Sequence, residues 1–189
     1  MRLLFEMDRK DYDPNGDVFR RLSSRGIIFR DGLVAVSYSR KNKHCEFPGG
    51  GVEAGEDSIT AMMREVREET GLIVKPETIR EFGRVHMIKK GRFEPVYIQD
   101  TSYYFCEVED RTVEPQLTAS EIRDDFVTLF VPIEEAIKIN EEVLPCDKCL
   151  EVLVERELRV MEMIRDQMKD QSPVTQATHS DGSGFSSPA

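Results

Sequence analysis

The sequence predicts an α/β fold in a single domain, and two observations indicate this class. Several runs rich in β-branched and aromatic residues are separated by turn residues, which is typical of strands. One helical pattern interrupts these runs, and two more helical patterns follow the last of them. A chain of 189 residues suits one domain. We expect this domain to span residues 1–169, followed by a disordered Ser-, Gly- and Pro-rich tail over 170–189.

The first part of the chain reads as strands joined by turns. Residues 1–13 predict a strand that ends at the turn sequence DPNG. Residues 25–39 hold two apolar runs on either side of Asp31-Gly32, a pair that favours a tight hairpin. A short strand over 44–47 then precedes three consecutive glycines, which predict a loop with unusual backbone angles.

A helix is predicted from Asp57 to Thr70. Its apolar residues recur at helical spacing, at Ile59, Met62, Met63 and Val66. Asp57 is a suitable N-cap, and Gly71 is a suitable C-terminal stop.

The second part of the chain predicts three strands and then two helices. The strands are expected over 80–90, 95–109 and 124–132, and the helices over 133–144 and 149–170. The apolar stripe of the last helix is broad. It would either pack over the sheet or pair with a second copy, so a homodimer is one alternative.

The net charge of the chain and the shortness of its apolar runs disfavour nucleic-acid polymers and membranes as partners. The formal net charge is −10 and the pI is about 4.9, so the chain repels nucleic-acid polymers and anionic membranes, although a local basic patch could hold one nucleotide. No apolar run approaches the roughly 20 residues that span a bilayer, and the start lacks a signal-peptide core, so we expect a cytoplasmic protein. Cys146 and Cys149 have zinc-like spacing but no second ligand pair, and free thiols are expected.

The helix over 57–70 concentrates negative charge on one face. Glu65, Glu68 and Glu69 fall within an arc of roughly 100°, and Arg64 supplies only one positive charge against them. Such a cluster raises its own pKa values unless a cation compensates it. Oxygen ligands without Cys or His indicate Mg²⁺ or Mn²⁺. The plain alternative is a solvated helix face with local ion pairs such as Arg64 to Glu68.

The wider pattern resembles, without a mismatch, the signature of the Nudix (MutT-like) hydrolase family. Average residue frequencies give a chance match on the order of 10⁻⁷. The order of the predicted strands and helices is also similar to the family's αβα sandwich around a mixed β-sheet. The matching residues are Gly50, Glu56, Arg64, Glu65, Val66, Glu68, Glu69, Gly71 and Leu72.

The resemblance implies roles for these residues. Glu65, Glu68 and Glu69 would bind Mg²⁺, and a carbonyl oxygen of Gly49 or Gly50 would add a ligand. Arg64 would orient the catalytic glutamates. Glu56, at the same cofactor-binding loop, would hold that loop against the helix.

The resemblance also implies a reaction, which is hydrolysis of a diphosphate linkage by water attack at phosphorus. The substrate would be a nucleoside diphosphate linked to another moiety, or a nucleoside triphosphate, including modified ones. A bound metal would neutralise charge and activate the water, and a carboxylate would remove its proton. Glu121 is our candidate base. The alternative is that Glu121 is an ordinary solvated loop acid.

Two other readings of the family resemblance remain. One is a catalytically silent nucleotide-binding or regulatory protein, which the complete set of Arg64, Glu65, Glu68 and Glu69 disfavours. The other is an isoprenoid diphosphate isomerase, which would need Cys or His ligands that have no match here.

The residues that would select the substrate lie outside the signature. Basic side chains over 40–43 and 84–92 would either meet phosphate oxygens or be solvated hairpin tips. Some ADP-ribose pyrophosphatases carry a proline beyond the signature where this chain has Met87 and Ile88, which weakens that assignment. His44 and His86 are expected to be structural or exposed.

Overall fold

The computed structural model describes residues 1–144 and 148–171, without the side chains of residues 148, 149 and 171. The expected free thiols of Cys146 and Cys149 therefore lie outside the described residues, as does the expected tail from residue 172 onward. Within the described part of the chain, no helix combines the length and apolarity needed to cross a bilayer.

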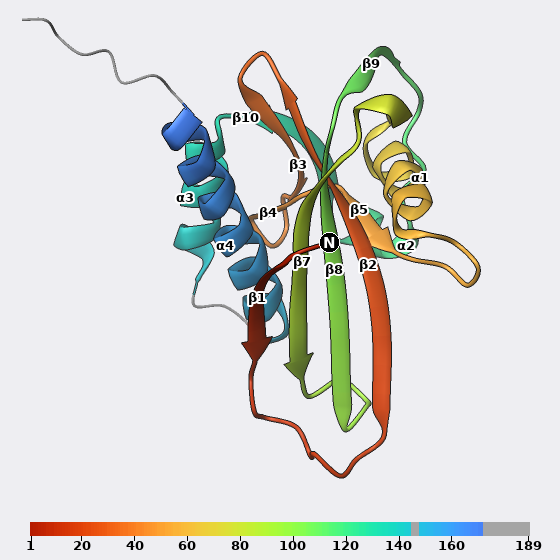
Figure 1. The fold of residues 1–189 in the computed structure, drawn as a ribbon, viewed down its shortest axis with the longest axis vertical. Coiled ribbons are helices and arrows are strands. Elements are labelled where there is room, and N and C mark those ends of the chain that lie inside the picture. The colour runs from red at the N-terminus through yellow and green to blue at the C-terminus, as the bar shows by residue number, and fades with distance from the viewer. Residues whose placement is uncertain (145–147, 172–189) are drawn as a thin grey trace, which may run out of the picture.

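A mixed β-sheet forms the centre of the molecule, with strand order β1-β7-β8-β2-β3-β10 (Figure 1). β1 is parallel to β7 and β2 is parallel to β8, whereas β7–β8, β2–β3 and β3–β10 are antiparallel. Short strands β5 and β4 pair with β2 and β3, and β6 and β9 form a separate pair. The strands are β1 Leu3–Asp8, β2 Val18–Arg30, β3 Leu33–Ser39, β4 His44–Glu46, β5 Gly49–Gly51, β6 Leu72–Val74, β7 Arg80–Lys89, β8 Val96–Cys106, β9 Val108–Thr112 and β10 Phe126–Val131.

Helices cover both faces of this sheet (Figure 1). α1 (Ser58–Thr70) lies on one face, and α3 (Ile133–Val143) and α4 (Lys148–Gln171) lie on the other. The predicted α/β class and αβα sandwich are therefore confirmed. A 3₁₀ turn η1 (Pro76–Thr78) and a short helix α2 (Ala119–Arg123) were not predicted.

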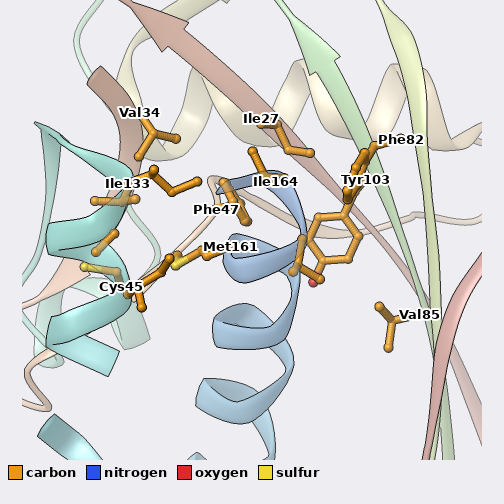
Figure 2. Packing of buried hydrophobic residues seen from close by; sticks show 14 of the residues in the cluster. Ile27, Val34, Cys45, Phe47, Phe82, Val85, Tyr103, Ile133, Met161 and Ile164 are labelled. Carbon is orange, nitrogen blue, oxygen red and sulfur yellow. The ribbon is translucent and has the colours of Figure 1, made fainter. Parts of the chain in front are cut away.

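The core divides between the two faces because side chains alternate along each strand. On β2, Ile27 joins the cluster under α3 and α4, and Ile28 joins the cluster under α1. Figure 2 shows the first cluster, in which Met161 and Ile164 of α4 approach Phe47. The apolar stripe of α4 is thus buried within the chain itself.

Three expectations about element boundaries change. The glycines at 49–51, expected as a loop, form β5, since their backbone pairs with Ser23–Arg25 of β2. A Cβ at Gly49 would lie 2.2 Å from the Ser24 carbonyl oxygen, so the close pairing requires glycine. The run over 95–109 divides into β8 and β9, and α4 continues through residue 171.

The ends of α1 are fixed locally, as predicted. The Asp57 carboxylate accepts hydrogen bonds from the backbone N–H of Ile59 and Thr60, at 2.9 and 3.0 Å. Gly71 ends the helix in the left-handed conformation, with φ of 72°, and its N–H donates to the Arg67 carbonyl.

We expect Gly71→Ala to lower the free energy of unfolding by about 2 kcal/mol or more. The positive φ disfavours a side chain, and a Cβ would also lie 2.1 Å from the Val113 carbonyl oxygen. Gly32→Ala is the matched control, since Gly32 has φ of 78° but nothing within 4 Å of its Cβ position. Urea denaturation of both variants measures the difference. Equal losses would mean that the Val113 contact is relieved at no cost.

Candidate active site

The glycine segment of β5 lies directly against the acidic face of α1. A Cβ at Gly50 would be 2.5 Å from the carboxyl carbon of Glu65, so any larger residue would displace that carboxylate. The structure thus brings Gly49 and Gly50 next to the predicted acids. We call Glu65, Glu68 and Glu69 the acidic cluster.

Arg64 links the acidic cluster to the glycine segment. Its Nε and Nη2 donate to the two carboxylate oxygens of Glu56, at 3.0 and 2.9 Å, and Nη2 also donates to the Gly51 carbonyl at 3.0 Å. Its Nη1 donates to Glu65 Oε1 at 2.8 Å and to Glu68 Oε2 at 3.2 Å. The hydrogen bonds from Arg64 to Glu56 lower the pKa of the Glu56 carboxylate. Arg64 therefore orients two of the acids, and Glu56 ties the preceding loop to the helix.

Glu69 is held by different partners. Its Oε2 accepts hydrogen bonds from the Gly49 N–H at 2.9 Å and from Ser37 Oγ of β3 at 3.0 Å. Burial raises the pKa of Glu69 to about 8, although nearby Arg25 acts in the opposite direction. Burial likewise raises the pKa of Glu65, against the effect of Arg64. Burial is therefore the main cause of both shifts, and repulsion within the acidic cluster, which the sequence analysis expected, contributes only through Glu68 acting on Glu65.

Glu121 lies in α2 instead of in a loop. Its carboxylate accepts from the Thr118 N–H at 2.6 Å and completes a capping box at the start of α2. Its charge nevertheless contributes to raising the pKa of both Glu65 and Glu69, so Glu121 is close enough to the acidic cluster to act on it.

The acidic cluster provides the oxygen donors that a hard divalent cation prefers. In the part of the chain that the structure describes, no three His, Cys, Asp or Glu side chains already converge on one point as a metal site would. One carboxylate oxygen of each acid makes no hydrogen bond to the described residues. Among the acids that pair with Arg64, Glu68 has the most exposed side chain, at 40%. A set of oxygen donors without Cys or His is of the type that Mg²⁺ and Mn²⁺ prefer.

A cavity of about 210 Å³ lies beside Gly50, on the α4 side of the sheet. It is lined by residues of β2, β5, β7, β8 and α4. Sequence analysis anticipated only Lys89 among its basic residues. The lining residues are Arg21, Ser23, Arg25, Gly50, Met87, Lys89, Tyr97, Gln99, Val152, Leu153 and Arg156.

The other basic residues singled out in the sequence lie elsewhere. Lys41 pairs with Asp124 at 2.7 Å, and Arg84 pairs with Asp100 at 3.6 Å. His44 is buried and contacts Glu46 at 2.8 Å, so its predicted structural role is supported. A larger cavity of about 820 Å³, lined by residues such as Phe29, Phe82 and Phe105, contains none of the acidic residues discussed above.

Comparisons with known proteins place these features in a family. The family model described as "NUDIX domain" matches residues 20–149, which include β5 and α1. The solution structure of the E. coli ORF135 protein is similar, with TM-score 0.55 and 18% identity over 82% of this chain and 94% of that chain. A NUDIX hydrolase from Nitrosomonas europaea has TM-score 0.55 and 20% identity over 87% of this chain and 100% of that chain. At these identities the two structures support the fold alone.

Proposed function

The chain belongs to the Nudix family, and from this premise we propose that it is a Mg²⁺-dependent pyrophosphohydrolase. The substrate is a nucleoside diphosphate linked to another moiety, or a nucleoside triphosphate, including modified ones. The observation that carries this proposal is the bonding of Arg64 to Glu65, Glu68 and the Gly51 carbonyl, which holds unpaired carboxylate oxygens beside a glycine segment.

Glu65, Glu68 and Glu69 would hold the metal, with a carbonyl of Gly49 or Gly50 as a further oxygen donor. When bound, Mg²⁺ supplies charge neutralisation for the diphosphate and lowers the pKa of coordinated water. Mn²⁺ offers the same chemistry. Nudix domains typically use divalent metals, which agrees with the oxygen-only donor set.

The protein's own groups position this chemistry. Arg64 donates hydrogen bonds to Glu65 and Glu68, and the Gly49 N–H and Ser37 Oγ donate to Glu69, which orients the three acids. Glu121 is our candidate for the carboxylate that accepts the proton of the attacking water. Its Oε2 accepts from the Thr118 N–H, and the second carboxylate oxygen would accept the proton.

The test is a hydrolysis assay with a substrate panel, in Mg²⁺ and in chelator. The panel contains ADP-ribose, sugar nucleotides, dinucleoside polyphosphates, NADH and oxidised deoxynucleotides, and phosphate is measured after treatment with phosphatase. We expect hydrolysis of at least one compound that chelator abolishes and Mg²⁺ restores. Hydrolysis that chelator leaves intact would contradict the metal assignment. Binding of nucleotides without turnover would favour the catalytically silent alternative.

A further inference from the structure

We propose that the cavity beside Gly50 binds a phosphate group on the part of the substrate beyond the cleaved diphosphate. This inference rests on the proposed function, and it narrows the substrate to compounds with an additional phosphate. The cavity is defined by the lining residues given above, and we call it the cationic pocket.

Charge is the first argument. Arg21, Arg25, Lys89 and Arg156 line the cationic pocket, and no acidic residue does. Behind the lining, Arg25 contacts Glu46 at 2.7 Å and Arg156 contacts Glu157 at 2.9 Å, so these two cations are balanced. Arg21 and Lys89 have no ion pair within the described residues, and they leave the pocket with excess positive charge.

Buried donors are the second argument. Arg25 Nε and Arg156 Nη2 make no hydrogen bond within the described residues, although Arg156 is only 2% exposed and Arg25 only 7%. Glu157 Oε1 lies near both, at 3.6 and 2.9 Å, and attracts them without accepting a hydrogen bond from either atom. A buried donor without an acceptor is destabilising. Arg25 and Arg156 both line the pocket, so an anion there would add an acceptor beside them.

Position is the third argument. Gly50 lines the cationic pocket, and its Cβ position is 2.5 Å from the Glu65 carboxyl carbon. At Gly51 the corresponding position is 3.2 Å from Arg21 Nη2. Gly50 therefore borders both the acidic cluster and the cationic pocket. A substrate with its diphosphate at the acids would reach the pocket by passing Gly50.

Contacts within the protein already position several side chains of the pocket. Gln99 Nε2 donates to Ser23 Oγ at 2.8 Å, and Arg156 Nη1 donates to Thr101 Oγ1 at 3.2 Å. Lys89 Nζ lies 5.6 Å from the ring centroid of Tyr97. A volume of about 210 Å³ is below that of a typical site for a whole small molecule, so the pocket suits one group of a larger substrate.

Titration with inorganic phosphate in the presence of chelator tests the pocket without the metal. We expect saturable NMR shifts at the backbone amides of Arg21, Lys89 and Gln99. Arg21→Met and Lys89→Met should each weaken binding about tenfold, since each removes one charged donor. Arg20→Met is the matched control, because Arg20 precedes Arg21 on β2, is exposed and points to the other face of the sheet. Absence of saturable shifts, or equal weakening by Arg20→Met, would overturn the proposal.

Substrate pairs that differ by one phosphate test the substrate class. For NADPH against NADH, and for ADP-ribose 2′-phosphate against ADP-ribose, we expect about tenfold lower KM for the phosphorylated member, and Arg21→Met should remove this difference. Equal KM values in both pairs would overturn the substrate assignment. If no compound is hydrolysed but phosphate still binds at the pocket, the proposed function fails and the phosphate site stands. If hydrolysis occurs but phosphate does not bind, the pocket assignment alone fails.

Discussion

Glu68→Gln is expected to reduce hydrolysis by about two orders of magnitude or more while leaving folding nearly unchanged. The substitution keeps the shape of the side chain but removes one negative charge from the proposed metal site. Its structural cost is small, because Glu68 is 40% exposed and contacts Arg64 at 3.2 Å. Loss of its charge also relieves repulsion, since Glu68 contributes to raising the pKa of Glu65.

Steady-state kinetics across a range of Mg²⁺ concentrations measures this effect, and thermal unfolding without metal measures stability. Glu77→Gln is the control, because Glu77 is exposed in η1, outside the acidic cluster, and receives none of the hydrogen bonds of Arg64. Comparable turnover of Glu68→Gln and the parent at saturating Mg²⁺ would rule out Glu68 as a ligand.

The second large effect concerns stability. Glu157→Ala should lower the free energy of unfolding by about 3–5 kcal/mol, because it leaves buried cations and donors unpaired. Glu157 is fully buried on α4, and its Oε1 accepts from Tyr103 at 2.7 Å and from Arg156 Nε at 3.0 Å. Its Oε2 accepts from the Phe47 N–H at 2.9 Å. In Figure 2 the Tyr103 ring extends from the sheet toward α4, which places its hydroxyl at this junction.

Chemical denaturation of three variants separates the contributions. Glu155→Ala, two residues earlier on α4, removes a partly exposed pair with Arg9 at 2.8 Å and should cost no more than about 1 kcal/mol. Glu157→Gln keeps the shape of the side chain and should be intermediate, which matters if Glu157→Ala does not fold. A loss for Glu157→Gln no larger than that for Glu155→Ala would show that the buried charge does not stabilise the junction of α4 with the sheet.

The sequence predicted an element correctly where contacts between residues close in the chain determine its conformation. The cap at Asp57 and the stop at Gly71 depend on neighbouring backbone groups, so they can be read from residue types alone. α2 is only five residues long and too short to show helical periodicity. Its usable signal was the spacing of Thr118 and Glu121, which is that of a capping box.

Contacts between distant segments could not be predicted in this way. β5 looked like a loop because its glycines carry no side-chain pattern, and its strand conformation comes from pairing with β2. Arg21 and Arg156 meet at the cationic pocket only because α4 packs across β2 and β8. The acidic cluster was predictable because its members share one helix, whereas the residues of the pocket are brought together by tertiary structure.

The parallel pairing of β2 with β8 has a consequence for the order of folding. Val18 pairs with Val96 and Ile28 with Cys106, so each contact closes a long stretch of chain that includes β5 and α1. Closing such a stretch costs entropy before the pairing compensates it, which slows folding relative to local hairpins. During synthesis, α1 emerges before β8 exists to support β2. β2, which pairs with β5 beside the acidic cluster, therefore gains its parallel neighbour only after residue 106 has left the ribosome.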